Sequence, residues 1–228
     1  MGILTGRENI IKAVGYVPPV LPENVIKSFE IFILNLIGEA SIYIKTPDAT
    51  AITDIDEPQI SLSLHATLNN LVSKKELQCG VSWEHFEVTD KVEKNVKTAR
   101  RFDIFFENWD VKNRMNYGVE AKILIENNSK KRTAVKLVEK YVSEAGMGKY
   151  INGIYKGRGC MLGYVLEGNV SSIISKINSE ICAVFDNSQC LSKVSDPQLT
   201  YSDVYRSEHK AKLSYPLFHL MLDFTCNT

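Results

Sequence analysis

The sequence lacks the features that assign a protein at once to a membrane, a secretory route or a zinc-cysteine fold. No stretch of its 228 residues is apolar over the roughly 20 positions that a membrane helix needs, and the most apolar one, Ile31–Ile37, is far shorter. Met1–Val14 mixes basic and acidic residues, so we expect no secretory signal. The five cysteines include no pair with the two-residue gap of zinc or redox motifs. These absences favour a soluble cytoplasmic protein with reduced thiols.

Motifs of several common enzyme classes are also missing. The glycine-rich segment Gly146–Gly159 does not match the G-x-x-x-x-G-K-[ST] loop that holds nucleotide phosphates. The chain has no G-x-S-x-G turn, and no acid is placed to complete a hydrolase triad with Ser207 and His209. We find no internal repeat and no Ser/Gly-rich linker, so residues 1–228 are predicted to form a single domain.

The composition is that of an ordinary globular protein, but the charge is unevenly distributed. Hydrophobic residues make up 44% of the chain and charged residues 24%, with 27 basic and 27 acidic side chains. Residues 1–90 hold 6 basic and 12 acidic side chains, whereas residues 91–228 hold 21 and 15. A polyanion would therefore contact the second part of the chain, and the acidic first part would face water or a protein partner.

Hydrophobic periodicity predicts a mixed α/β protein. Apolar residues have helical spacing at Glu23–Tyr43, from Glu57 to about Lys75, at Lys131–Ala145 and at Val170–Phe185. Strands are predicted at Val81–Thr89, Arg101–Phe106, Tyr117–Glu126, Cys160–Leu166, about Val204–Glu208 and Leu217–Phe224. A helix between the third and fourth strands implies a crossover and a parallel pair. We therefore expect a mixed central β-sheet flanked by helices.

The second and third strands carry the residues that suggest chemistry. If they form a hairpin with its turn between Val111 and Lys112, opposed residue numbers add up to 223, which places Asp103 opposite Glu120 and Arg101 opposite Lys122. Asp103, Glu120 and Lys122 would then project from one face of the sheet. Opposed carboxylates repel unless a cation neutralises them, and Mg²⁺ or Mn²⁺ prefers such oxygen ligands.

A divalent ion at this position would polarise a phosphoryl oxygen and activate a bound water. Lys122 would orient that water or stabilise the charge of the transition state, and the Ala121 carbonyl could add a ligand. The alternative is a surface salt bridge, because an Asp followed by Glu-x-Lys also occurs by chance and exposed charged pairs are common.

The order of elements, with Asp on the second strand of a meander and Glu-x-Lys on the third, resembles the PD-(D/E)XK nuclease superfamily over about 57–166. The resemblance implies a restriction-endonuclease-like core (αβββαβ) over residues 57–166, an N-terminal helical extension over 1–56, and a C-terminal helix and strands over 167–228. It implies Asp103 and Glu120 as metal ligands, Lys122 as the catalytic lysine and Glu57 as a further acid, with Glu76 a weaker candidate. Phe102 stands where the eponymous proline would be.

The resemblance implies a Mg²⁺-dependent endonuclease acting on DNA. Because some members have lost catalysis, an inactive scaffold or a DNA- or partner-binding subunit is the alternative. Bacterial antiviral defence systems often pair such nucleases with an ATPase or helicase, which is the protein partner that we expect. The residues that we expect to contact the nucleic acid are Lys97, Arg100, Arg101, Lys130, Lys131, Arg132, Lys149, Lys156, Arg158 and His209.

Overall fold

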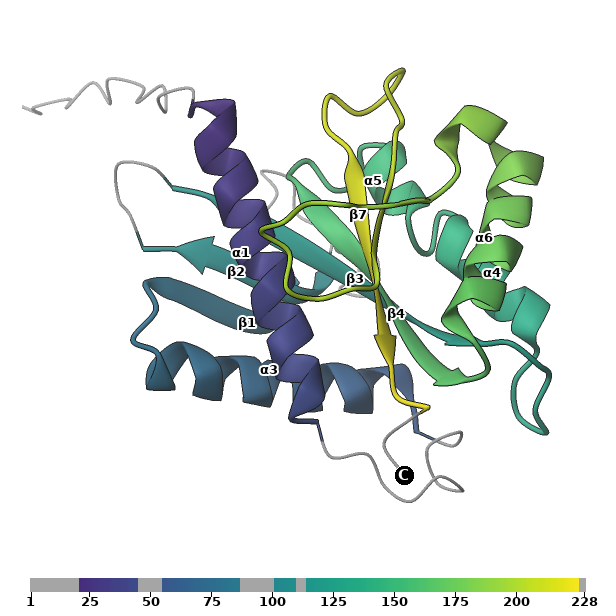
Figure 1. The fold of residues 1–228 in the computed structure, drawn as a ribbon, viewed down its shortest axis with the longest axis horizontal. Coiled ribbons are helices and arrows are strands. Elements are labelled where there is room, and N and C mark those ends of the chain that lie inside the picture. Colours follow the sequence, from purple (N-terminus) through teal and green to yellow (C-terminus); the bar gives the residue numbers. More distant parts are fainter. Residues whose placement is uncertain (1–20, 45–54, 87–100, 110–113, 226–228) are drawn as a thin grey trace, which may run out of the picture.

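A seven-stranded mixed sheet forms the centre of the protein (Figure 1). The computed structural model describes residues 21–44, 55–86, 101–109 and 114–225. The strands are β1 (Cys79–Phe86), β2 (Arg101–Asn108), β3 (Asn116–Ile125), β4 (Gly159–Glu167), β5 (Ser192–Lys193), β6 (Val204–Ser207) and β7 (Leu217–Asp223). Their order across the sheet is β1-β2-β3-β4-β7-β6-β5. The pairs β3–β4 and β4–β7 are parallel and the other pairs are antiparallel.

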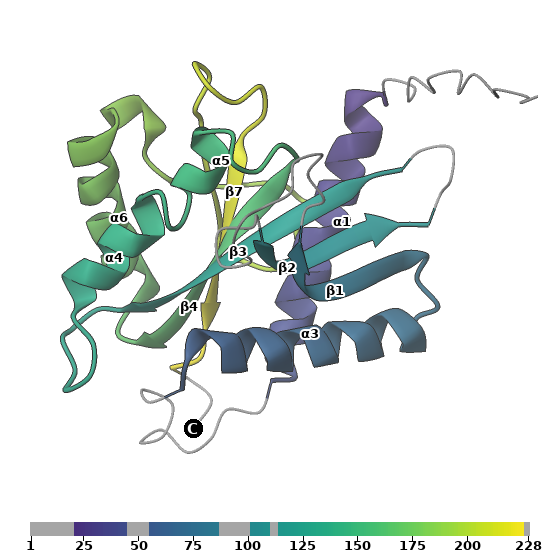
Figure 2. The ribbon, with the colours of Figure 1, turned by 180° about the vertical axis from the view of Figure 1, so that it is seen from behind.

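Helices cover both faces of this sheet (Figures 1 and 2). The helices are α1 (Glu23–Ile42), α3 (Glu57–Lys74), α4 (Ala134–Val142), the single-turn α5 (Gly148–Ile151), α6 (Val170–Val184) and the 3-10 turn η2 (Asn187–Gln189). Apolar residues of α1 and α3 pack with one face of the sheet, and those of α5, α6 and most of α4 pack with the other, while Ala134 and Leu137 of α4 contact the first core. The β3 strand, next to the central strand β4, is therefore covered on both sides.

The predicted elements are confirmed where the structure describes them, and the parallel pairing of the third and fourth strands is confirmed as well. Part of the first predicted strand, residues 87–89, lies outside the described residues. Three elements were not predicted, namely α5, the 3-10 turn η2 and the two-residue β5. Each has four residues or fewer, too few to show a periodic pattern, and Gly146 and Gly148 near the start of α5 favour a loop.

Two further features bear on the expectations from composition. Within the described residues, no helix combines the length and apolar character that crossing a membrane requires. Cys79, Cys160, Cys182 and Cys190 are free thiols. The Sγ atoms of Cys182 and Cys190 lie 3.1 Å apart, although nothing in their spacing along the chain indicates this proximity.

Candidate active site

The predicted register of β2 and β3 is confirmed. Ile104 pairs with Val119, Phe105 with Gly118, Phe106 with Tyr117 and Glu107 with Asn116, so the paired numbers add up to 223. The pairing stops at Ile104, one residue short of Asp103, and the first part of β2 pairs only with β1. Phe102 and Ile104 belong to the cores on opposite faces of the sheet, so the alternation of side chains is broken at Asp103.

This break places the Asp103 carboxylate in the gap between β2 and β3. Asp103 Oδ2 accepts a hydrogen bond of 2.7 Å from the backbone N–H of Ala121, where an unbroken ladder would offer a backbone carbonyl. The carboxylate of Asp103, a β2 residue, therefore lies at the edge of β3. The expectation that it projects from the same face of the sheet as Glu120 and Lys122 was wrong. The carboxylate satisfies a buried backbone donor that the divergence of the strands leaves unpaired.

Glu57 reaches the same edge of β3 from another element. Helix α3 begins at Glu57. Asp56 and Gln59 form a capping box at this end, and Pro58 occupies the first turn. Glu57 Oε2 accepts a hydrogen bond of 3.3 Å from the N–H of Ile123, and Oε1 lies 3.2 Å from Lys122 Nζ. Glu76 lies beyond the opposite end of this 18-residue helix, about 27 Å away along its axis, so it does not join the site.

The Lys122 ammonium lies among oxygen atoms. Lys122 Nζ is 2.7 Å from Glu120 Oε1 and also donates to the Ala121 carbonyl and to Glu57. The Lys122 side chain is 12% exposed and the Glu120 side chain only 2%. An exposed salt bridge, the alternative that the sequence left open, therefore does not describe this pair.

Two residues from the segment after α4 complete the group. Lys149 Nζ is 2.7 Å from Glu120 Oε1, and the Tyr155 hydroxyl donates to Glu120 Oε2 at 2.7 Å. Lys149 also donates to the Tyr155 oxygen at 3.1 Å. We call the set of Glu57, Asp103, Glu120, Lys122, Lys149 and Tyr155 the acid–lysine cluster.

Burial and the charges within the cluster shift the pKa values of its members. Burial, followed by the negative charge of Glu120, raises the pKa of Asp103 to about 6, although Lys122 acts in the opposite direction. Burial alone would lower the pKa of Lys122, but the surrounding carboxylates, Glu120 foremost, outweigh it and raise that pKa. Burial and then Glu120 raise the pKa of Tyr155 well above its usual range. Three carboxylates face two ammonium groups, so acid is in excess, and Glu120 is the most deeply buried of these side chains.

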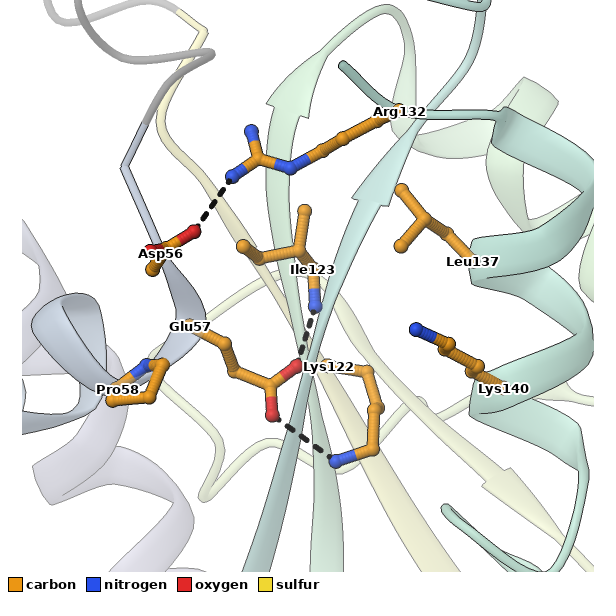
Figure 3. A pocket seen from close by; sticks show the side chains of 8 residues that line it. All are labelled: Asp56, Glu57, Pro58, Lys122, Ile123, Arg132, Leu137 and Lys140. Carbon is orange, nitrogen blue, oxygen red and sulfur yellow. Dashed lines mark hydrogen bonds and ion pairs between the residues drawn. The ribbon is translucent and has the colours of Figure 1, made fainter.

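A pocket of about 300 Å³ opens beside Glu57 and Lys122 (Figure 3). It lies between the start of α3, the middle of β3 and α4. Lys140 extends from α4 toward this space, and Arg132 borders it on another side, where it pairs with Asp56 at 3.8 Å. The pocket is therefore lined by three cations, Lys122, Arg132 and Lys140, and by two acids, Asp56 and Glu57.

The donor atoms of the cluster suit a hard divalent cation. In the part of the chain that the structure describes, no three His, Cys, Asp or Glu side chains are grouped as ligands of a single ion. The oxygens of Glu57, Glu120 and Ala121 nevertheless surround one positive centre, the Lys122 ammonium. Carboxylate and carbonyl oxygens are the ligand types that Mg²⁺ and Mn²⁺ prefer, but in this structure they hold the Lys122 ammonium.

The basic residues predicted to contact nucleic acid fall into four groups. Lys149 belongs to the cluster, and Arg132 borders the pocket, where it also donates to the Ile55 carbonyl. Lys130, Lys131 and Lys156 are exposed. Arg101 pairs with Glu84 at 3.1 Å, and Arg158 with Glu23 and Glu30 at 2.8 and 3.0 Å. Lys97 and Arg100 lie outside the described residues.

His209 is not brought to the cluster. It is 3% exposed and joins a buried chain of hydrogen bonds in which Ser207 Oγ lies 2.8 Å from His209 Nε2 and 2.9 Å from His219 Nε2. Gln189 and Tyr141 occupy the two outer imidazole nitrogens. Each histidine then has one accepting and one donating nitrogen, which is the neutral form. This arrangement supports a structural role for His209.

The histidine chain predicts a loss of stability in acid. Burial lowers the pKa of His209 to about 4 and that of His219 to about 3, against about 6.5 in an unfolded chain. Because the folded-state values are depressed, the stabilisation is complete above about pH 6.5 and disappears as the pH falls toward 3. The free-energy cost of His219→Asn, measured by urea unfolding, should therefore be about 2 to 3 kcal/mol smaller at pH 4.5 than at pH 7. Leu220→Ala, a buried change without a titrating group, is the control, and equal costs of His219→Asn at both pH values would contradict the prediction.

Tyr155 is the cluster residue that sequence reasoning missed, and Lys149 was assigned only to the nucleic acid. Tyr155 lies 35 residues from Glu120 and follows a turn with no recognisable pattern. The basic and aromatic residues between Gly146 and Gly159 were the available signal, but they indicate a loop as readily as a site.

Comparison of the chain with family models, curated proteins and solved structures found no match, so the site is interpreted from its own geometry.

Proposed function

We propose that the protein is a metal-dependent nuclease that hydrolyses phosphodiester bonds of DNA, with a restriction-endonuclease-like core of the PD-(D/E)XK type. The observation that carries the proposal is the acid–lysine cluster around β3. Asp103 and Glu57 accept hydrogen bonds from two backbone N–H groups on the same edge of this strand, those of Ala121 and Ile123. The side chains of Glu120 and Lys122 pair with each other on the same strand. A fold needs no such excess of buried carboxylates for its stability.

In this proposal Asp103, Glu120, Glu57 and the Ala121 carbonyl hold Mg²⁺ or Mn²⁺. When bound, such an ion polarises a phosphoryl oxygen and lowers the pKa of a water ligand. Lys122 donates hydrogen bonds to the attacking water or to the developing negative charge on the phosphate. Lys149 and Tyr155 position Glu120 by occupying its two oxygens.

The surroundings of the cluster are consistent with a polyanionic substrate. Lys140 and Arg132 border the pocket beside Lys122, and Lys130, Lys131 and Lys156 are exposed cations. The protein would act in the cytoplasm, as one subunit of a bacterial antiviral defence system with an ATPase or helicase partner. The acidic residues of the first 90 positions would form the docking surface for that partner.

One observation favours a second candidate, a catalytically inactive scaffold or DNA-binding subunit of the same fold. Glu120 is saturated, because Oε1 accepts from Lys122 and Lys149 while Oε2 accepts from Tyr155. A cluster that is neutralised by its own lysines can serve packing alone.

A cleavage assay separates the two candidates. The purified full chain is incubated with labelled single-stranded and duplex DNA and with RNA, in Mg²⁺, in Mn²⁺ and in EDTA. We expect cleavage of DNA in both metals and none in EDTA. Absence of cleavage in every metal, together with an unchanged melting temperature on metal addition, would support the scaffold.

A further inference from the structure

A hollow of about 390 Å³ lies on the sheet at the N-terminal end of β3, apart from the pocket beside Lys122. Three of the residues that line it are aromatic, namely His85, Phe102 and Phe105. The rings of His85 and Phe105 stack with centroids 4.0 Å apart and an interplanar angle of 4°. Phe102 and Phe105 are 3% and 8% exposed, so the half-buried His85 ring is the more accessible part of this aromatic wall.

The hollow adjoins the acid–lysine cluster through two rings. Phe102 packs on Tyr155 with ring centroids 3.9 Å apart, and the Tyr155 hydroxyl donates to Glu120. Gly118 makes this packing possible, because a Cβ at that position would lie 2.1 Å from the Phe102 ring. A group bound in the hollow would thus lie a short way along β3 from Glu120.

A cation and polar groups border the same hollow. Arg114 has a side chain that is 73% exposed and pairs with Glu107 at 3.3 Å. An exposed ion pair of this kind contributes little to stability, so Arg114 can exchange Glu107 for a phosphate at little cost. Arg158 also lines the hollow, but Glu23 and Glu30 hold its guanidinium.

We propose that this hollow binds an unpaired nucleobase of the substrate, stacked on the aromatic wall that His85 completes, with Arg114 at the adjoining phosphate. The inference rests on the proposed function and narrows its substrate to single-stranded or locally unpaired nucleic acid. Aromatic side chains and arginine together bind any base by its ring face. A base inside a duplex offers no free ring face, since its neighbours cover both sides.

The test measures binding in EDTA, where no cleavage takes place. Two fluorescein-labelled probes are used, a 12-nucleotide single strand and the blunt duplex of the same sequence. Each probe is titrated with the wild-type protein and with the variants His85→Ala, His85→Phe and Trp83→Ala. Fluorescence anisotropy measures the binding. Trp83 is the matched control, an exposed aromatic residue of the same strand that does not line the hollow. Thermal unfolding checks that each variant is folded.

We expect the wild type to prefer the single strand, and His85→Ala to weaken that binding about tenfold. His85→Phe should bind within about threefold of the wild type, because it keeps the stacking surface, and Trp83→Ala should not differ from the wild type. Equal affinity for duplex and single strand, no effect of His85→Ala, or no binding of either probe would overturn the inference. A protein that shows the expected binding but cuts nothing in Mg²⁺ keeps this subsite and loses the nuclease activity, so the two failures can be told apart.

Discussion

Glu120→Gln should abolish Mg²⁺-dependent DNA cleavage, with an expected fall in rate of about a thousandfold or more. The change keeps the size of the side chain and its hydrogen bond from Tyr155, but it removes the charge that faces Lys122 and Lys149. Initial rates are measured at saturating DNA and at several Mg²⁺ concentrations. A glutamine that merely weakened metal binding would recover activity at high Mg²⁺.

The matched control for this variant is Glu139→Gln, an exposed acid on α4. It should cleave like the wild type. Circular dichroism should show both variants folded, because the Glu120→Gln side chain still fills its buried position. If Glu120→Gln cleaves as fast as the wild type, Glu120 has no role in catalysis and the proposed mechanism fails.

Lys122→Met should destabilise the metal-free protein by about 3 kcal/mol, and divalent metal should recover much of that loss. The substitution removes the ammonium between Glu57 and Glu120, so that the three carboxylates then face a single ammonium, that of Lys149. A divalent cation is then the group that can neutralise them. Melting temperatures in EDTA, Mg²⁺ and Mn²⁺ measure the effect, and the metal-induced rise should be larger for the variant than for the wild type.

Lys140→Met provides the control, because Lys140 lines the same pocket but is exposed. It should melt near the wild-type temperature with and without metal. A Lys122→Met protein that is destabilised to the same degree in EDTA and in Mn²⁺ would contradict the proposed metal site. The measurement does not depend on catalysis, so it also tests a protein of this fold that has lost activity but still binds metal.

Much of the fold was predictable because each long element carries its own signal. The apolar spacing of Glu23–Ile42, the capping residues Asp56 and Gln59 around the start of α3 and the β-branched residues of β3 are local properties that tertiary contacts reinforce. The parallel placement of β3 and β4 also followed from sequence order, since the connection between them contains a helix. Elements of four residues or fewer, such as α5 and β5, carry too few positions for a pattern.

The candidate site was predictable only in part. Glu120 and Lys122 lie together because residues two apart on a strand share a face of the sheet. The register of the β2–β3 hairpin places Asp103 of β2 next to them. The place of the Asp103 carboxylate between the strands depends on a break in alternation that no local pattern indicates. The covering of Glu120 by Lys149 and Tyr155 requires the turn after α4 to fold back over β3.

The order of the elements, the register of the β2–β3 hairpin and the identity of its three charged residues could be predicted from the chain alone, because they depend on periodicity and on neighbours in sequence. The packing of distant elements decides that Glu120 and Lys122 are mostly buried and paired, and that His209 lies in a hydrogen-bonded chain away from them. Burial and ion pairing arise from contacts between residues far apart in sequence, such as Glu57 with Lys122. The sequence pattern of a strand predicts which residues lie on each of its faces. The other elements that pack against the strand decide which groups those residues contact.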